Sequence, residues 1–353
     1  MTETKRNLNL DLIRCFALIL VLGMHFYDNS GFYTISLHGA GDFIAALGRM
    51  LCTTCVPLFL LLSGWLCSSK KLSPRYYLGI LRIMEVYFIN TLACILFEAL
   101  YLHNFMSLRD MAGGLINFEI NGYAWYVLLY GGLFLMMPFL NMMYAGCSNK
   151  NQKLILVFTF FALSVLPSLL NSFVHIYSLW WAKLYPICYY FTGSFLREHL
   201  GRRKPGPLAL AFILILTGFC LFNQFYFQGE AYNYESIHYE HYQVYTLSVL
   251  LFVLLYSLNL GGLPGLFSRL IYKIAELSFA AYLMSWISDG IIYREFVPHF
   301  PDPRDRFIWV FLLVLLALLF SLLMAQLCHW IYLPLDRFLR PRLQRLLPEK
   351  HRE

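Results

Sequence analysis

Charged residues are scarce in this sequence. Asp, Glu, Lys and Arg together make up 13% of its 353 residues, whereas 59% are hydrophobic and 18% aromatic. No hydrophilic stretch is long enough to form a soluble domain of about 100 residues. The chain instead carries repeated apolar runs of about 20 residues, the length that crosses a bilayer as a helix. These features exclude an ordinary soluble protein and predict an all-α, polytopic integral membrane protein.

Several patterns of enzyme and metal chemistry are missing as well. The sequence has no Ser-His-Asp order, no Gly-rich phosphate loop, no metal-ligand cluster and no internal repeat. Cys52 and Cys55 have the spacing of a redox or zinc pair, but no second Cys/His pair accompanies them. We interpret them as small packing residues near a helix start, so neither a disulfide nor a metal site is expected.

Ten hydrophobic runs predict ten membrane-spanning helices. They cover residues 8–28, 43–67, 78–101, 123–144, 154–174, 179–198, 207–227, 243–260, 272–293 and 307–330. The first run contains Arg14 and lacks a small-residue cleavage site after it, which indicates a retained helix rather than a removed signal. We expect one transmembrane domain over residues 1–335 and a basic cytoplasmic tail over residues 336–353.

Lysine and arginine gather in the short segments between these runs, and the chain has a net charge of +7. If ten helices alternate, the basic groups all fall on one side, which the positive-inside rule assigns to the cytoplasm. Both termini are therefore expected in the cytoplasm, in a multi-pass protein of the cell (inner or cytoplasmic) membrane. A positive net charge can also indicate binding to nucleic acid. Here the positive-inside rule explains why lysine and arginine cluster between the apolar runs, so no nucleic-acid partner is expected.

The stretch LDLIRCFALILVLGMHF, residues 10–26, places Arg14 and His25 in the first predicted span. At about 100° per residue, they lie within about 20° of the same helix face and about 16 Å apart along the axis. Ionisable groups at membrane depth are costly and by default indicate function. The alternative is an arginine that reaches the membrane interface and a histidine satisfied in a core. The shared face favours function.

Three further stretches carry polar or aromatic residues in predicted spans. Ser63 and Gly64 lie in VPLFLLLSGWL, and Ser-Gly pairs in membrane helices usually serve packing. Arg82 lies near the cytoplasmic end of the third span, where its guanidinium group can pair with Glu85 at i, i+3 or can instead bind phosphate oxygens. Trp125 and Tyr126 open the fourth span, and such residues also suit the aromatic belt at a membrane interface.

Taken in order, these stretches resemble the membrane-bound acyltransferase family 3. The resemblance rests on Arg-x10-His in the first span, VPLFLLLSGWL in the second, an arginine in the third, AWYVLLYGGLFLMMPFLN in the fourth and YPICYYFTGSFL in the sixth. Their order and spacing cover nearly the whole chain. Two motifs depart from the family pattern. Leu58-Phe59-Leu60 stands where adjacent phenylalanines are usual, and YLMS at 282–285 stands where Tyr-Leu-x-His is common.

That family acylates sugars and surface polysaccharides. The resemblance therefore implies an acyltransferase with acetyl-CoA or another acyl-CoA as donor and a sugar or glycan as acceptor. No metal is expected, and a homo-oligomer is compatible with the sequence. The resemblance also implies catalytic roles for Arg14 and His25. It places Ser63 and Gly64 in the motif of the second helix and assigns Arg82 to the donor. We further expect Arg75, Ser63 and Gly64 to bind the donor, and Trp125, Tyr126 and Tyr282 to bind the acceptor.

In this interpretation, His25 is either a general base on an acceptor hydroxyl or a transient acyl carrier, and the sequence leaves both open. The alternative function is a proton-coupled transporter or exporter of a small molecule or glycan, without acyl transfer. Transporters often show inverted repeats and broken helices, and the sequence shows no such symmetry. A catalytically silent sensor or partner domain is a third class, against which the presence of Arg14 and His25 argues.

Overall fold

The computed structural model describes residues 6–171 and 179–345, and over these residues the predicted all-α fold is confirmed. No strand forms within these ranges, and only an isolated antiparallel bridge joins Ser36 to Glu230. Parts of the predicted span 154–174 and of the predicted tail 336–353 lie outside the described residues.

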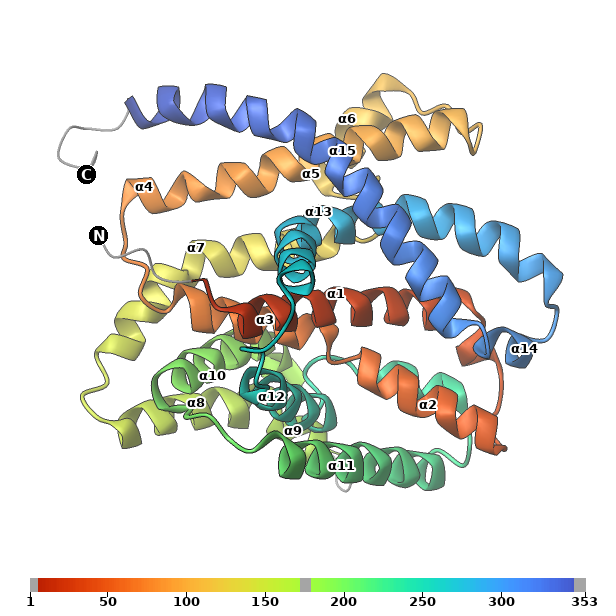
Figure 1. The fold of residues 1–353 in the computed structure, drawn as a ribbon, viewed down its shortest axis with the longest axis horizontal. Coiled ribbons are helices and arrows are strands. Elements are labelled where there is room, and N and C mark those ends of the chain that lie inside the picture. Colours follow the sequence, from red (N-terminus) through yellow and green to blue (C-terminus); the bar gives the residue numbers. More distant parts are fainter. Residues whose placement is uncertain (1–5, 172–178, 346–353) are drawn as a thin grey trace. The chain divides into compact units, whose positions relative to one another are not determined.

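The helices are labelled in Figure 1. In chain order they are α1 (Leu8–Asn29), η1 (Phe32–Thr34), α2 (Ala40–Cys52), α3 (Cys55–Cys67), α4 (Pro74–Tyr77), α5 (Gly79–Leu100), α6 (Leu108–Asn117), α7 (Trp125–Ala145), α8 (Lys150–Ser164), α9 (Leu166–Leu170), η2 (Leu179–Leu184), α10 (Tyr185–His199), α11 (Pro205–Tyr226), η3 (Ala231–Ser236), α12 (Tyr242–Ser257), α13 (Gly265–Phe296), η4 (Val297–His299), α14 (Pro303–Phe307) and α15 (Val310–Arg345).

Among the described residues, 7 helical stretches are long and apolar enough to cross a membrane. They are Leu8–Thr34, Ala40–Cys67, Pro74–Leu100, Trp125–Ala145, Pro205–Tyr226, Gly265–His299 and Val310–Leu339. The other predicted spans correspond to α8, α10 and α12, which have 15, 15 and 16 residues. A polytopic membrane protein is thus confirmed, and the number of crossings stays a prediction.

The predicted span 43–67 is formed by two helices rather than one. α2 ends at Cys52, Thr53 and Thr54 form a turn, and α3 begins at Cys55. Pro57 explains the break, because it has no N–H to donate to the Thr53 carbonyl and its ring would clash with that carbonyl in a continuous helix. By contrast, α15 is longer than the span predicted over residues 307–330. It continues to Arg345 and so enters the predicted tail.

One compact unit comprises Met1–Ser68, Tyr144–Glu276 and Phe296–Val314, and α1 is a largely buried helix of this unit. α1 packs against α2, α3 and α12, and its Ile13, Leu18 and Leu22 are fully buried. The Asn9 amide donates to the carbonyls of Leu255 and Leu258 at 3.0 and 2.9 Å. The Leu255 carbonyl also accepts from the backbone N–H of Leu258 at 3.4 Å, so Asn9 adds a second donor at the end of α12, where helix carbonyls lack intrahelical partners.

Two glycines bring α3 and α10 of this unit into close contact. A Cβ atom at Gly64 would lie 2.0 Å from the Tyr190 carbonyl oxygen, and one at Gly193 would lie 2.1 Å from the Leu61 carbonyl oxygen. The hydroxyl of Ser194 donates to the Gly64 carbonyl across the same contact, at 3.2 Å. The backbones approach this closely because neither glycine has a side chain, as at other small-residue contacts of membrane helices.

Replacing Gly193 with alanine is expected to destabilise the protein by about 1–3 kcal/mol, because a backbone carbonyl cannot move aside for the new methyl group. Thermal unfolding of the detergent-purified variant measures the loss. Gly218→Ala is the matched control, since Gly218 also lies within a membrane helix but has nothing within 4 Å of the position that a Cβ atom would take. Equal stability of the two variants would contradict the close-contact explanation.

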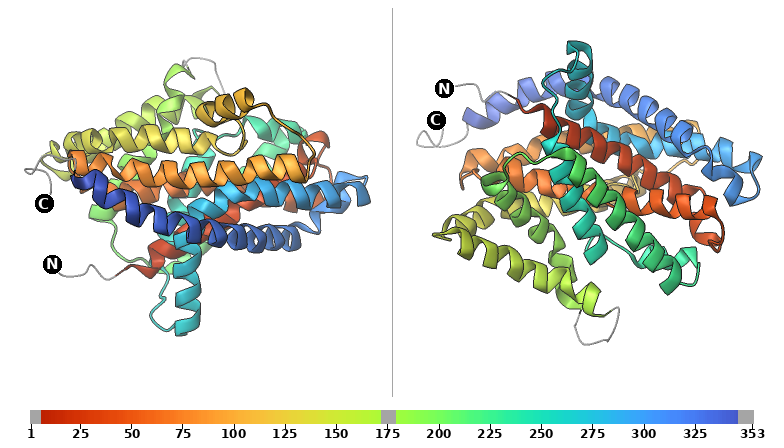
Figure 2. Two further views of the ribbon diagram at one scale, coloured as in Figure 1. Left: turned by 90° about the horizontal axis from the view of Figure 1, so that it is seen from above. Right: turned by 60° about the horizontal axis from the view of Figure 1, so that its bottom comes forward.

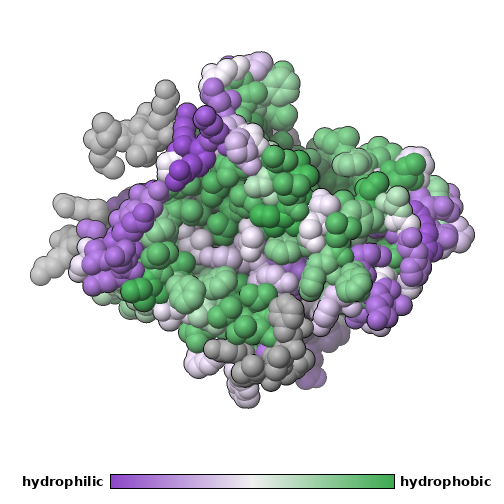
Figure 3. Space-filling view, turned by 90° about the horizontal axis from the view of Figure 1, so that it is seen from below, coloured by the Kyte–Doolittle hydropathy of each residue, from purple (hydrophilic) through white to green (hydrophobic). Residues whose placement is uncertain are grey.

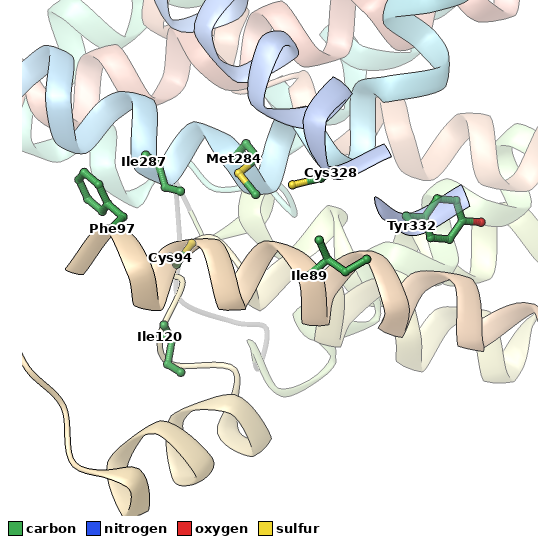
Figure 4. Packing of buried hydrophobic residues seen from close by; sticks show 8 residues of the cluster. All are labelled: Ile89, Cys94, Phe97, Ile120, Met284, Ile287, Cys328 and Tyr332. Carbon is green, nitrogen blue, oxygen red and sulfur yellow. The ribbon is translucent and has the colours of Figure 1, made fainter. Parts of the chain in front are cut away.

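The second unit comprises Ser69–Met143, Leu277–Glu295 and Leu315–Glu353. α5 and α7 lie side by side in it (Figure 2), and the Tyr76 hydroxyl before α5 donates to the Phe134 carbonyl of α7 at 2.6 Å. Its apolar core contains Ile89, Cys94, Phe97, Ile120, Met284, Ile287, Cys328 and Tyr332. In Figure 4, Met284 and Ile287 of α13 point toward α5, so apolar packing occupies this face of α13.

The surface carries many exposed apolar side chains, as expected where helices meet lipid. Only 11% of the most apolar part of α11 is buried, and Ile213, Leu214, Leu221 and Phe225 of this helix are exposed. On the face shown in Figure 3, hydrophobic side chains cover much of the middle, and hydrophilic ones gather near the left and right edges. Such extended apolar surface fits a membrane environment.

Candidate active site

The predicted first helix is confirmed as α1, which runs unbroken through both Arg14 and His25. His25 is buried, with 7% of the residue exposed, whereas the Arg14 side chain is 30% exposed. Because the helix is continuous, its geometry places the two residues near one face and about three turns apart. One helix thus carries a partly exposed cation and a buried histidine.

Arg14 forms an ion pair that the sequence analysis missed. Its Nη1 lies 3.4 Å from Oδ1 of Asp11, one turn earlier on α1. Asp11 also accepts from Arg6, at 2.6 Å from Nε and 3.2 Å from Nη2, and the shorter bond raises the pKa of the Arg6 guanidinium above its ordinary value. The i, i+3 spacing of Asp11 and Arg14 was a sequence signal for this pair.

The Arg6 side chain also fixes the segment before α1. Its Nη2 donates to the Tyr272 carbonyl of α13 at 3.2 Å, and its guanidinium lies 4.7 Å from the centre of the Tyr272 ring. Asp11, whose side chain is 7% exposed, therefore lies between two arginines that it holds in place. Arg14 uses one nitrogen for this contact.

His25 lies in the last two turns of α1, and its backbone carbonyl accepts from the Asn29 amide at 2.7 Å. A buried imidazole on a rigid helix has few orientations and limited access to water. Both properties suit a group that takes a proton from a hydroxyl or carries an acyl group for a short time.

Ser63 and Gly64 lie in the contact between α3 and α10. The Ser63 hydroxyl donates to the Phe59 carbonyl of its own helix at 2.8 Å. Gly64 allows the close contact with α10 described above, which agrees with the packing role that Ser-Gly pairs usually have in membrane helices. A role in donor binding stays a prediction for both residues.

The other predicted donor residues belong to the second unit. Arg75 lies on α4, a short helix whose first turn is capped by the Ser73 hydroxyl, and its side chain is exposed. Arg82 on α5 is also exposed, and its guanidinium lies 5.6 Å from the centre of the Tyr332 ring. Exposed guanidinium groups are suited to bind phosphate oxygens.

The structure brings the three predicted acceptor residues together within the second unit. The rings of Trp125 and Tyr126 lie 5.9 Å apart, and those of Tyr126 and Tyr282 lie 5.7 Å apart, both nearly perpendicular. Trp125 is 39% exposed, whereas Tyr126 and Tyr282 are buried. Aromatic pairs at these distances and angles are favourable beyond the area they bury.

The predicted site residues divide between the two units. The first unit contains Arg14, His25, Ser63 and Gly64, and the second contains Arg75, Arg82, Trp125, Tyr126 and Tyr282. Within residues 6–171 and 179–345, no group of three or more His, Cys, Asp and Glu side chains is placed to hold a metal ion.

Comparison with known families decides the class of the protein. A family model described as an acyltransferase domain matches residues 7–326, nearly the whole chain. The chain belongs to acyltransferase family 3. No curated protein and no solved structure matches it. The resemblance inferred from the motifs is thus confirmed, and the chain is a membrane acyltransferase.

This acyltransferase also contains a buried arginine that the sequence analysis did not single out. Arg49 lies in α2, within an apolar stretch, and is 1% exposed. It donates to the Tyr33 hydroxyl at 3.0 Å, the Thr53 hydroxyl at 3.1 Å and the Ile237 carbonyl at 3.3 Å. These neutral acceptors come from η1, the end of α2 and the end of η3, so Arg49 ties the three segments together.

His241 lies at the start of α12, in the same unit as Arg49. Burial lowers its pKa to about 4 from the ordinary 6.5, and the positive charges of Arg49 and His238 add to this effect. Its Nδ1 is buried and, within the described part of the chain, has no hydrogen-bond partner. The fold therefore favours the neutral imidazole.

The acyltransferase is expected to lose stability as the pH falls from about 6.5 to about 4. In this range the unfolded chain binds a proton at His241 that the folded chain does not, which costs on the order of 1–3 kcal/mol. Unfolding measured across this range checks the effect. His241→Gln should weaken the pH dependence, whereas the control His299→Gln, at an exposed histidine, should keep it. An unchanged pH dependence in His241→Gln would contradict this explanation.

Proposed function

We propose that this acyltransferase moves an acyl group, most simply acetyl, from cytoplasmic acyl-CoA to a hydroxyl group of a sugar or cell-surface glycan. The observation that carries the proposal is the placement of Arg14 and His25 on one largely buried, apolar helix of a family 3 acyltransferase. The protein acts in the cell (inner or cytoplasmic) membrane, with its basic segments on the side of the donor.

His25 supplies the reactive nitrogen in this proposal. As a general base, it takes the proton of the acceptor hydroxyl while the oxygen bonds to the acyl carbon; the thioester C–S bond breaks, and the proton passes to the CoA sulfur. As an acyl carrier, its nitrogen bonds to the acyl carbon while the thioester C–S bond breaks, and the imidazole N–H proton passes to the CoA sulfur. The acceptor oxygen then bonds to the acyl carbon while the C–N bond breaks, and the hydroxyl proton returns to the imidazole. Both routes form one ester and release one CoA thiol.

The arginines position the donor. Arg14, held by Asp11 through one nitrogen, directs its remaining nitrogens to the thioester arm or to a phosphate. Arg82 and Arg75, both exposed, bind further phosphates of CoA, with Ser63 and Gly64 on the donor side. Trp125, Tyr126 and Tyr282 bind the acceptor.

Transfer of a labelled acetyl group tests this function. Purified protein in proteoliposomes receives radiolabelled acetyl-CoA and the glycan fraction of the producing cells. The expected result is label in the glycan that alkali releases as acetate, with one free CoA thiol per label. Glycan that stays unlabelled while the protein is folded and monodisperse would overturn the proposal.

A further inference from the structure

The part of α13 in the second unit has two different faces. Met284 and Ile287 fill the apolar core on one side (Figure 4). The other side carries polar residues spaced three or four positions apart, which places them in one stripe along the helix. They are Ser278, Tyr282, Ser285, Asp289 and Tyr293, and each is buried.

Asp289 carries the carboxyl group of this stripe. It is 4% exposed and lies in a stretch apolar enough to cross a membrane. Its Oδ2 accepts from the Tyr123 hydroxyl at 2.9 Å. A carboxyl group at such a place is costly, faces protein or water rather than lipid, and commonly belongs to a functional site.

Hydrogen bonds fix the segment before α7 to this part of α13. The Tyr282 hydroxyl donates to the Tyr123 carbonyl, and the Asn121 amide donates to the Leu283 carbonyl at 2.9 Å. The Asn121 side chain also accepts from the backbone N–H of Tyr123, at 2.9 Å. Hydrogen bonds to its backbone carbonyl and N–H, together with the bond from its hydroxyl to Asp289, thus hold Tyr123 in place next to Asp289.

Aromatic rings surround this pair. The ring of Tyr123 lies 5.2 Å from that of Trp286, at 87°, and 6.3 Å from that of Tyr282. Tyr123 and Trp286 are half-buried, and the adjacent Trp125 is exposed. Two half-buried aromatic rings, those of Tyr123 and Trp286, therefore lie beside a buried carboxyl group, a combination that offers stacking faces and a hydrogen-bond acceptor at one place.

We propose that Asp289, Tyr123 and Trp286 bind the acceptor, and that the acceptor is a sugar ring whose hydroxyl groups donate to Asp289. This inference rests on the proposed function and assigns the acceptor subsite to residues of the second unit. The C–H faces of the ring stack on Trp286, while the Tyr123 hydroxyl orients the Asp289 carboxyl group and contacts a neighbouring sugar hydroxyl. The subsite adds new residues to the three acceptor residues proposed above.

The test measures acetyl transfer at varied concentrations of the glycan fraction from the producing cells, with labelled acetyl-CoA as donor. Asp289→Asn and Tyr123→Phe keep the side-chain shapes and change the hydrogen bonding. Loss of a charged hydrogen bond predicts a rise of about ten-fold or more in the half-saturating glycan concentration for Asp289→Asn. Tyr123→Phe should raise it less, and the half-saturating acetyl-CoA concentration should stay at the wild-type value.

Ser288→Ala is the matched control. Ser288 is the neighbour of Asp289 and is 0% exposed, and its hydroxyl lies 2.9 Å from that of Ser321 on α15. This variant should lower the melting temperature without changing the half-saturating glycan concentration.

The outcomes separate the two proposals. If wild-type protein transfers label, and Asp289→Asn and Tyr123→Phe have the same half-saturating glycan concentration as wild-type protein, the proposed acceptor subsite is wrong and the proposed function stands. The subsite is equally wrong if these variants, like Ser288→Ala, change only the melting temperature. If wild-type protein transfers no label, the proposed function fails and the subsite with it.

Discussion

Replacing His25 with alanine is expected to lower acyl transfer by about 10²–10⁴-fold while the protein still folds and inserts. The size follows from loss of general-base catalysis alone. His25→Gln, which keeps hydrogen bonding but not basicity, should be nearly as inactive as alanine. The measurement is transfer of labelled acetyl groups per molecule of monodisperse, purified protein.

The control for this experiment is His299→Gln, which removes an exposed histidine outside the proposed site. It should keep wild-type activity. If His25 served only in packing, its variants would show low yield and a low melting temperature but normal activity per folded molecule. A fully active His25→Ala would exclude His25 as base or acyl carrier.

Arg14 variants are expected to show the next largest effect. Removing a charged hydrogen bond to the donor costs about 1.5–3 kcal/mol, so Arg14→Ala should weaken acetyl-CoA use by about 10- to 150-fold. Arg14→Lys should recover little of this loss. Asp11 binds one guanidinium nitrogen of Arg14 at 3.4 Å, and lysine has a single nitrogen for both Asp11 and the donor.

Arg6→Lys is the matched control for Arg14→Lys, because Arg6 binds the same carboxylate but has no proposed contact with the donor. Half-saturating acetyl-CoA concentrations of the variants give the comparison. Wild-type values for Arg14→Lys would show that charge alone suffices, and wild-type values for Arg14→Ala would contradict a donor role.

The sequence predicted much of the fold because long apolar runs have few stable forms in lipid. A bilayer offers no water to pair with backbone groups, so such runs form helices, and α1 appears as predicted. The split between α2 and α3 was missed, although Pro57 was a visible signal for it. Arg49 was missed because it interrupts an apolar run only once, and its partners come from other segments.

In the candidate site too, contacts between residues close in the sequence were easier to predict than contacts between distant segments. The ion pair between Asp11 and Arg14 is local and could have been predicted from its i, i+3 spacing. The bond between Tyr123 and Asp289 joins residues 166 positions apart, and no periodicity in the sequence indicates it. Helical periodicity shows which residues share a face, but the opposing segment becomes known only from the packed structure.

Transfer across a sealed membrane tests the central claim most directly. Proteoliposomes with one orientation of the protein enclose the glycan fraction, and labelled acetyl-CoA is added outside, on the side of the basic segments. The account predicts label in the enclosed glycan and CoA thiol outside, with both lost in His25→Gln. Label that stays outside, or that reaches the enclosed glycan equally with His25→Gln, would contradict the account.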